Sequence, residues 1–411
     1  MSDLLFLSHR IPYPPDKGEK IRAWHILQRL ARRHRLHVGC FIDDPADWAH
    51  VPMLRAHCAD LACFGIDRRW RLLRSLPRLR PGLPLSLAYF QDARLRRFVA
   101  KKLAQGMQGA FVYCSAMAPY LMHGGRLPRV LDMVDVDSEK WREYARRAAW
   151  PARAVWAREA RTLFRFERQA VKAFDRTVLV SAAEAERFLE LAPDCAGRVG
   201  VIENGVDLAR FALGPWADPY PPGGPVVTFV ATLDYWPNVD AAVWFAEKIL
   251  PRLRAACPGV RFAVVGARPA DAVRKLAALD GVLVTGRVDD VRPYIAHAAC
   301  LVAPLRIARG IQNKVLEAMA MAAAVVATPE AFSGIRAQAG RDLLVAGTEA
   351  GFADSVADVL AGRHPGLGAA ARQAMQAGYD WETTLSALET LFGRREGAQA
   401  VPRAVPQPVA P

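Results

Sequence analysis

One stretch of the sequence combines residue types that suit a nucleoside diphosphate. A loop is expected between a strand at Cys300 to Pro304 and a helix that starts within Ile311 to Asn313, and it carries Arg306, Arg309 and Gly310. Free backbone N–H groups at a helix N-terminus suit a phosphate. Lys314 and Glu317 are three residues apart, so both can face one side of the helix. A cation for a diphosphate beside a carboxylate for ribose hydroxyls is what a nucleotide sugar requires; an ordinary surface Lys–Glu pair is the alternative.

A second candidate is the loop Pro14 to Gly18, which follows the first expected strand. Gly18 permits close approach to the backbone, and Lys17 adds a positive charge beside it. The helix that follows offers free N–H groups to donor phosphates or to an acceptor. An ordinary strand-to-helix turn is the alternative.

Carboxylates also gather after a strand expected at Arg129 to Met133, namely Asp132, Asp135 and Asp137. They could coordinate a divalent ion or act on an acceptor hydroxyl, whereas Asp137 or Ser138 could instead cap the next helix. Asp135 is the polar candidate for the acceptor side. Ser115 ends another expected strand and could line the same cleft.

Alternating strands and helices must position these residues. The chain opens with an apolar strand at Leu4 to Ser8, a helix at Lys20 to Arg33 and a strand at Leu36 to Ile42, which is typical of a parallel α/β sheet. Later elements of this half are strands at 110–114, 129–133, 177–181 and 199–202 and helices at 92–105, 138–174 and 182–191. The breaker Pro215 to Pro225 follows, and then the same rhythm restarts, with strands at 226–231, 261–265, 282–285, 300–304 and 324–327. Such sheets bind ligands at the carboxyl ends of their strands.

The chain resembles the retaining GT-B glycosyltransferases of family 4. The resemblance is carried by Lys314 to Thr328 (KVLEAMAMAAAVVAT) and by further motifs at 201–211 (VIENGVDLARF), 228–236, 261–266 (RFAVVG), 286–288 and 379–392. More narrowly, the chain is similar to the sugar transferases associated with bacterial exosortase and exopolysaccharide systems. The motifs PYPPDKGEKIR, DMVDVDSEKW and PLRIARGIQNKVLEAMA carry that similarity.

The resemblance implies an α/β protein of the GT-B fold, with two Rossmann-like, doubly wound parallel-sheet domains facing across a cleft. The acceptor domain would span residues 1–210 and the nucleotide-sugar domain residues 211–378. A closing helix at 379–395 would cross back to the N-terminal domain. The Ala/Pro/Val-rich residues 396–411 are expected to be a disordered tail.

The resemblance also implies roles for individual residues. Catalytic roles are expected for Asp135, Arg309 and Glu317. Donor-binding roles are expected for Gly18, Asn204, Asn238, Arg306, Gly310, Asn313, Lys314 and Glu317. Acceptor-side roles are expected for Lys17, Ser115 and Asp135. The family's first glutamate is replaced by Arg309, and its usual lysine after the first C-terminal strand is not evident in LDYWPN, so the charge for a diphosphate falls to Arg306, Arg309 and Lys314.

The implied reaction is transfer of a sugar, with retention, from a nucleoside diphosphate sugar to a saccharide acceptor, either free or lipid-linked, in exopolysaccharide biosynthesis. No cofactor and no metal are expected. Because Arg309 departs from the family pattern, a non-catalytic GT-B protein that binds nucleotide or polysaccharide is the alternative. An NAD-dependent oxidoreductase is excluded, since residues 8–20 lack the GxGxxG turn.

Charge and composition indicate which partners the protein meets and where in the cell it acts. The chain has 411 residues, 52% of them hydrophobic, and a formal net charge of +14, which suits two soluble domains that meet polyanions. Basic residues interleaved with aromatics at 68–102 and 140–172 predict contact with an anionic membrane surface; an ordinary solvated basic face is the alternative. No motif predicts specific nucleic-acid binding. Seven scattered cysteines and the absence of a long apolar run predict a cytoplasmic protein, peripheral at the membrane at most.

Overall fold

A computed structural model of the chain describes residues 1–67, 82–123, 127–308 and 310–392. The predicted tail, Arg309 and residues 68–81 of the first basic stretch therefore lie outside the described residues. The chain divides into two compact units, the first made of Met1–Glu203 with the described residues from Leu385 onward, and the second of Asn204–Thr384. The division falls a few residues before the expected boundary at 210, and the chain returns to the first unit at Leu385.

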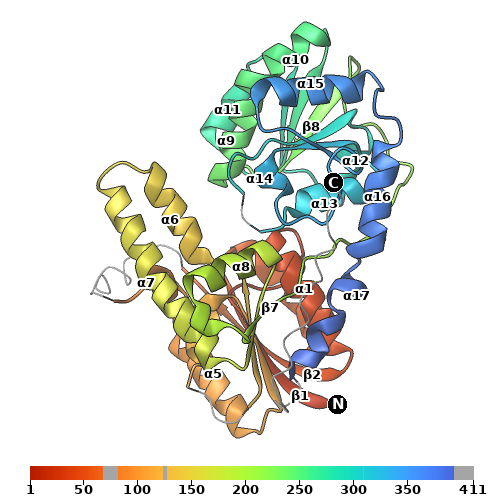
Figure 1. Ribbon diagram of the computed structural model, residues 1–411. Coiled ribbons are helices and arrows are strands. Elements are labelled where there is room, and N and C mark those ends of the chain that lie inside the picture. The colour runs from red at the N-terminus through yellow and green to blue at the C-terminus, as the bar shows by residue number, and fades with distance from the viewer. Residues whose placement is uncertain (68–81, 124–126, 309, 393–411) are drawn as a thin grey trace. The chain divides into compact units, whose positions relative to one another are not determined.

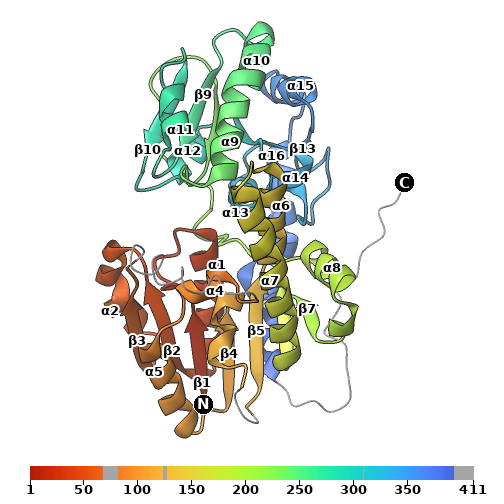
Figure 2. The ribbon, with the colours of Figure 1, turned by 90° about the vertical axis from the view of Figure 1, so that its left-hand side faces the viewer.

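The first unit is built on a seven-stranded parallel sheet of order β3-β2-β1-β4-β5-β6-β7 (Figures 1 and 2). Its strands are β1 (Ser2–Ser8), β2 (His34–Ile42), β3 (Asp60–Gly65), β4 (Gly109–Tyr113), β5 (Arg129–Val134), β6 (Arg176–Leu179) and β7 (Val199–Val201). Its α-helices are α1 (Gly18–Ala31), α2 (Val51–Arg55), α4 (Leu85–Tyr89), α5 (Ala93–Ala104), α6 (Asp137–Arg147), α7 (Ala152–Ala173) and α8 (Ala182–Leu191). Short 3-10 helices occur at Pro45–His50, Ser115–Tyr120, Pro193–Cys195 and Ser386–Phe392.

The second unit is built on a six-stranded parallel sheet of order β10-β9-β8-β11-β12-β13. Its strands are β8 (Val226–Val230), β9 (Arg261–Val265), β10 (Val282–Gly286), β11 (Cys300–Ala303), β12 (Val325–Ala327) and β13 (Leu344–Val345). Its α-helices are α9 (Trp236–Trp244), α10 (Leu250–Ala256), α11 (Asp271–Leu276), α12 (Arg292–Ala296), α13 (Asn313–Ala320), α14 (Pro329–Phe332), α15 (Glu349–Leu360), α16 (Leu367–Gly378) and α17 (Trp381–Thr384). A π-helical turn at Phe245–Ile249 joins α9 to α10.

Central strands of both sheets are apolar along their length because helices cover them. Leu4 to Ser8 of β1 are all buried, as are Cys300 to Ala303 of β11. Strands buried on both faces lose the alternation of apolar and polar residues that marks a half-exposed strand. The prediction of two Rossmann-like parallel-sheet domains is confirmed.

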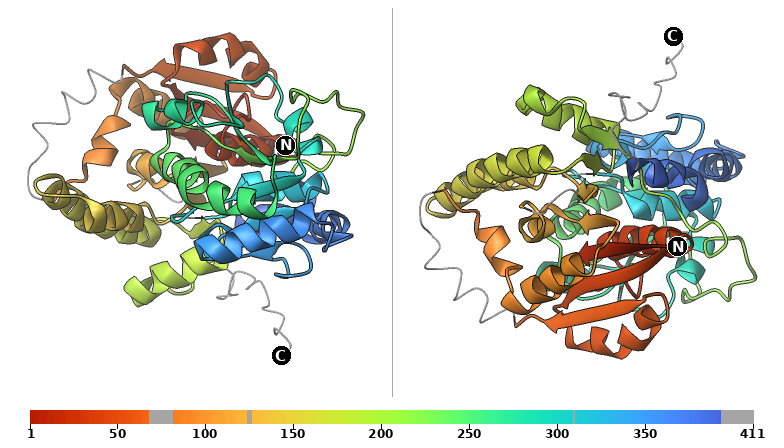
Figure 3. Two further views of the ribbon diagram at one scale, coloured as in Figure 1. Left: turned by 90° about the horizontal axis from the view of Figure 1, so that it is seen from above. Right: turned by 90° about the horizontal axis from the view of Figure 1, so that it is seen from below.

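Two of the predicted helices are wrong as single elements. The helix expected at 138–174 is two antiparallel helices, α6 and α7, which extend out from the rest of their unit (Figure 3). Pro151 has no N–H to donate and keeps Trp150 out of the helical conformation, so the chain turns there. The closing helix expected over 379–395 is the short α17 followed by a 3-10 helix, Ser386–Phe392, whose Glu389 pairs with Arg29 of the first unit.

Candidate functional site

The order of strands in the second unit defines where a ligand can sit. The chain runs outward from β8 through β9 to β10, then returns to place β11 on the other side of β8. In an open parallel sheet, the loops after the two strands on either side of such a switch point diverge and leave a crevice. Here those loops lead into α9 and α13, so the predicted residues Asn238 and Lys314 belong to the two elements that flank the crevice.

Lys314 and Asn238 are in direct contact. Lys314 Nζ donates to Asn238 Oδ1 at 2.6 Å, and Asn238 Nδ2 donates to the carbonyl of Thr232 at 2.8 Å. The ammonium group also lies 5.0 Å from the centre of the Phe229 ring. The cation is thus held by a side chain that is itself fixed to the loop after β8.

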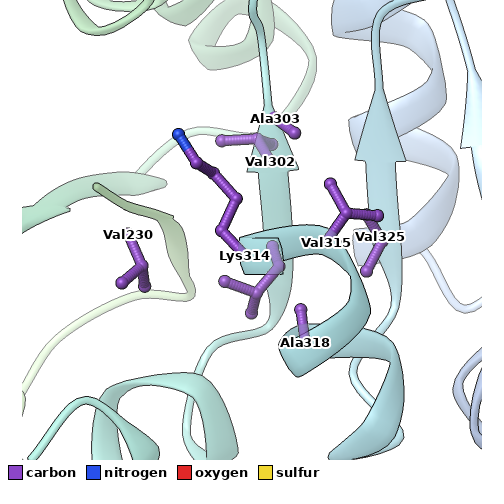
Figure 4. Close-up of a pocket in the computed structure, with 8 residues that line it drawn as sticks. Val230, Val302, Ala303, Lys314, Val315, Ala318 and Val325 are labelled. Carbon is purple, nitrogen blue, oxygen red and sulfur yellow. The ribbon is translucent and has the colours of Figure 1, made fainter. Parts of the chain in front are cut away.

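A small apolar cavity lies beneath the Lys314 side chain (Figure 4). Its lining comes from the core strands and from α13, and comprises Val230, Leu301, Val302, Ala303, Val315, Ala318 and Val325 together with Lys314. Figure 4 shows the stem of Lys314 rising past Val230 and Val302 so that its nitrogen lies at the carboxyl end of β11. The apolar stem is buried while the charged end reaches the edge of the sheet.

Burial changes the acid–base behaviour of the predicted pair. It lowers the pKa of Lys314 to about 7, against the opposing effect of Glu317. It raises the pKa of Glu317 to about 7, against the positive charges of Arg210 and Lys314. Both groups titrate near neutral pH, so a bound anion or hydroxyl can shift either one between its charged and neutral form.

Arg210 is a residue of this site that the sequence analysis missed. Its positive charge is the largest factor that lowers the pKa of Glu317. Its carbonyl accepts a hydrogen bond from Arg292, at 3.0 Å, which fixes the backbone there. The motif VIENGVDLARF contains Arg210, but its local pattern gives no sign that α13 lies nearby.

Asn204 and Asn313 form the other polar contact at the start of α13. Asn204 Nδ2 donates to Asn313 Oδ1 at 2.9 Å, which links the turn after β7 to the first residue of the helix. Asn313 Nδ2 is buried and has no hydrogen-bond partner among the described residues. Asn204 therefore belongs with the second unit and contacts the helix that bears Lys314.

In the basic loop before α13, one arginine expected to bind a phosphate is paired with a carboxylate. Arg306 donates to both carboxylate oxygens of Asp240, and its guanidinium lies 5.5 Å from the centre of the Trp244 ring. Gly310 adopts a left-handed conformation, with φ of 62°, which favours glycine at that turn. Arg309 lies outside the described residues, so its predicted catalytic role stays a prediction.

The first unit has its own switch point, between β1 and β4. Lys17 and Gly18 follow β1, where Lys17 is the N-cap of α1 and makes no side-chain capping bond. Ser115 follows β4, is buried, and comes directly after Cys114, which has a positive φ of 78°. The sheet order therefore brings these predicted residues to one edge.

Asp135 follows β5, the next strand along that sheet. Burial, and then the charges of Glu184 and Asp137, raise its pKa to about 7. Its Oδ1 atom is buried and has no hydrogen-bond partner among the described residues. A carboxylate in this state can accept a hydrogen bond from a hydroxyl that reaches it.

The capping interpretation of Asp137 and Ser138 is wrong. Neither side chain caps α6; Glu184 Oε2 accepts from the N–H of Val136 at 2.8 Å, and Glu167 Oε1 accepts from the N–H of Ser138 at 3.1 Å. The Ser138 hydroxyl donates to the other oxygen of Glu167 at 2.5 Å. These two carboxylates come from α8 and α7, so no pattern near residue 137 could have revealed them.

Three residues before Asp135, Asp132 forms a fully buried ion pair with Arg22. Arg22 Nε donates to Asp132 Oδ2 at 2.9 Å, which ties α1 to the end of β5. Burial raises the pKa of Asp132 while Arg22 opposes that rise. The pair fixes the helix that starts at Gly18 relative to the strand that precedes Asp135.

Within the described ranges, no cluster of three or more His, Cys, Asp or Glu side chains is arranged to hold a metal ion. None of the helices in the described part of the chain combines the length and apolar character needed to cross a membrane.

Comparison with known proteins places this geometry in context. Residues 224–362, within the second unit, match the family described as "Glycosyl transferases group 1". The phosphatidyl-myo-inositol mannosyltransferase of Mycolicibacterium smegmatis is 33% identical over 204 residues, which are 48% of this chain and 52% of the relative. The chain thus matches about half the length of that curated relative.

Solved structures share the architecture of nearly the whole chain. Sucrose-phosphate synthase from Thermosynechococcus elongatus superposes with a TM-score of 0.70 at 18% identity, covering 95% of this chain and 98% of that one. HepE from Anabaena, in complex with UDP and glucose, gives 0.68 at 17% identity, covering 95% and 99%. At such identities the likeness is one of fold, and the fold is GT-B.

Proposed function

We propose that this chain is a glycosyltransferase that moves a sugar from a nucleoside diphosphate sugar to a saccharide hydroxyl. The observation that carries the proposal is the Lys314–Asn238 contact at the switch point of the second sheet. It lies inside the segment that matches the group 1 glycosyltransferases. A cation of adjustable charge, a free helix N-terminus and a carboxylate occur there together.

The diphosphate is the group that these residues are suited to bind. As the bond between the anomeric carbon and the phosphate oxygen breaks, negative charge grows on the departing diphosphate. Lys314 and the N-terminal N–H groups of α13 stabilise that charge, and Arg309 adds to it. Glu317 accepts hydrogen bonds from the ribose hydroxyls of the donor.

The acceptor hydroxyl forms the new bond to the same anomeric carbon. The proton of the attacking hydroxyl passes to the departing phosphate oxygen, on the face where the old bond breaks. This course retains the anomeric configuration and requires no carboxylate nucleophile. In the first unit, Asp135 accepts a hydrogen bond from another hydroxyl of the acceptor sugar, and Ser115, Lys17 and Gly18 lie on the same edge of that unit's sheet.

The relatives support the choice of donor and acceptor. HepE was crystallised with UDP-glucose, and the mycobacterial relative is named as a mannosyltransferase of phosphatidyl-myo-inositol. We therefore assign this chain a nucleoside diphosphate hexose as donor and a lipid-linked saccharide as acceptor, in the assembly of an exopolysaccharide. An acceptor of that kind is met at the inner face of the cell membrane, where the basic stretches 68–102 and 140–172 suit anionic lipid.

A donor screen tests the proposal. Thermal unfolding is followed with UDP, GDP, ADP and dTDP sugars, and any donor that stabilises the protein is then incubated with membrane extract to detect transfer. Glu317→Gln is expected to remove most of the donor-induced shift in Tm. Glu330→Gln, at an exposed glutamate of the same unit, serves as the matched control and keeps the shift.

Two outcomes decide between the proposal and its alternative. Stabilisation by one class of nucleotide sugar followed by release of its nucleoside diphosphate supports the enzyme. Tight binding without transfer or hydrolysis, across donors and extracts, supports the non-catalytic binding protein that the replacement at Arg309 suggests. If Glu317→Gln kept the full donor-induced shift in Tm, the proposed donor site would be wrong.

A further inference from the structure

The turn between α6 and α7 carries an unusually exposed apolar side chain. Trp150 is 83% exposed, and Val155, one turn into α7, is 39% exposed. Leu83 is 54% exposed and lies beside α7, because Arg158 Nη2 donates to its carbonyl at 3.2 Å. Large apolar side chains gathered at the end of a projecting element indicate a surface that another phase or partner covers.

The two helices hold this turn rigidly. The Trp141 ring of α6 stacks on the Trp156 ring of α7, with centres 4.9 Å apart and an angle of 19° between the planes. Tyr144 packs edge-on against Trp141 at 5.7 Å. Closer to the sheet, the Ser138–Glu167 hydrogen bonds join the same two helices. The braced pair of helices projects from the first unit (Figures 1 and 3), and Trp150 lies in the turn that joins them.

Exposed positive charge lies along this hairpin, and Arg146 and Arg153 flank its turn. Among the described residues, none of four exposed arginines on this hairpin has an acidic partner within 4.0 Å, namely Arg146, Arg153, Arg161 and Arg165. Two acidic residues of α7, in contrast, are buried and accept hydrogen bonds from other parts of the first unit. Glu159 accepts from the N–H groups of Leu85 and Ser86, and Glu167 accepts from Ser138. The solvent-facing charge of the hairpin is thus strongly positive.

We infer that the α6–α7 hairpin docks onto an anionic lipid bilayer through its tip. Trp150 enters the headgroup region, where an amphipathic ring is most stable, and Val155 and Leu83 follow it to the apolar boundary. Arg146 and Arg153, which flank the turn, meet lipid phosphates beside it. A lipid surface explains both the apolar tip and the arginines beside it, whereas a nucleic acid would account only for the arginines.

This inference deepens the proposed function, because the hairpin grows directly from the acceptor side of the first unit. Asp135 lies two residues before the start of α6, and Trp150 lies just beyond its end. A helix of 11 residues is about 16 Å long at 1.5 Å per residue. A docked tip therefore holds Asp135 roughly that far from the lipid headgroups, within reach of a saccharide attached to a membrane lipid.

Vesicle sedimentation of the full-length chain tests the inference without any donor present. We expect binding to phosphatidylcholine vesicles that contain phosphatidylglycerol, little binding to phosphatidylcholine alone, and a loss of binding at high salt. Trp150→Ala should weaken binding to the anionic vesicles about tenfold, and Arg146→Gln with Arg153→Gln should weaken it at least as much. Trp48→Ala, at a 47% exposed tryptophan elsewhere in the same unit, should leave binding unchanged.

Several results would overturn the inference. Equal binding of the wild type to neutral and anionic vesicles would do so, as would undiminished binding by both hairpin variants with wild-type thermal unfolding. Light scattering that shows a dimer broken by Trp150→Ala, without vesicle binding, would reassign the tip to a second copy of the chain. Because no nucleotide sugar is used, failure of the donor site leaves this test intact, and failure here leaves the donor screen intact.

Discussion

The side chains of Lys314 and Asn238 meet at 2.6 Å although they come from different helices of the second unit. Asn238 uses its amide oxygen for Lys314 and its amide nitrogen for the carbonyl of Thr232, so both ends of the amide are occupied. Lys314 is therefore aimed by a residue on the opposite side of the switch point. The proposed donor site is thus built from the loop after β8 and the helix after β11.

Replacing Asn238 should weaken nucleotide binding without unfolding the protein. Asn238→Ala removes the acceptor that orients the ammonium group, a hydrogen bond to a charged group that contributes about 1.5–3 kcal/mol. We expect the Kd for the preferred nucleoside diphosphate to rise about tenfold or more by titration calorimetry. Asn238→Asp should also weaken binding, because the new carboxylate pairs with Lys314 and repels the diphosphate. A wild-type Kd in both variants would exclude this role for Asn238.

Nucleotide binding should take up protons above neutral pH. Because burial lowers the pKa of Lys314 to about 7, most of its molecules are neutral at about pH 8 in the free protein. A bound diphosphate favours the charged form, so binding should take up close to one proton at about pH 8, and affinity should fall as pH rises above about 7. Calorimetry in buffers of different ionisation enthalpy measures that uptake.

A permanently charged variant supplies the control for this proton uptake. Lys314→Arg is expected to bind nucleotide with no uptake, since guanidinium stays protonated throughout. Glu317, whose pKa is also raised to about 7, is mostly ionised at about pH 8, so Glu317→Gln should leave the uptake in place. Equal uptake in wild type and Lys314→Arg would assign the titrating group elsewhere.

Asp135 should give transfer a pH dependence of its own. Its pKa is raised to about 7, and only the ionised form accepts a hydrogen bond at both oxygens, so turnover should fall as pH drops through about 7. Asp135→Asn should lower turnover about 100-fold and flatten that limb of the profile. Nucleotide affinity, which depends on the second unit, should stay unchanged. A variant with full turnover and the wild-type pH profile would argue against this assignment.

Gly266 should tolerate no side chain. It directly follows β9 and has a φ of +152°, and a Cβ placed there would overlap the carbonyl oxygen of Ala231, next to the Thr232 carbonyl that fixes Asn238. Gly266→Ala is expected to cost about 3 kcal/mol or more in the free energy of unfolding, measured with urea.

Gly340 provides the matched comparison, since it has a φ of +83° and no atom within 4 Å of an added Cβ. Gly340→Ala should cost only the conformational strain, about 1–2 kcal/mol. Equal costs for the two substitutions would show that backbone conformation alone, and not the contact with Ala231, makes Gly266 necessary.

Local sequence patterns predicted most of the strands and helices that bear the site. The apolar runs of β1 and β11 and the periodicity of α1 are properties of neighbouring residues, so they are readable without the fold. β3, β13 and the helices α2, α4, α14, α15 and α16 were not predicted, and the expected helix at 138–174 is divided near Pro151. A proline's effect depends on whether its neighbours can satisfy the freed backbone, which packing decides.

The sequence alone determined that Lys314 and Glu317 share one face of a helix preceded by a glycine-containing basic loop, because residues three apart on a helix are neighbours in any fold. Tertiary structure decided which groups meet them. The order of strands brings Asn238 into contact with Lys314 and places the charge of Arg210 near Glu317. It also places Arg306 where its guanidinium pairs with Asp240. Burial then shifts the pKa values of Lys314, Glu317 and Asp135 toward neutrality, and desolvation depends on the whole packed unit and not on any local motif.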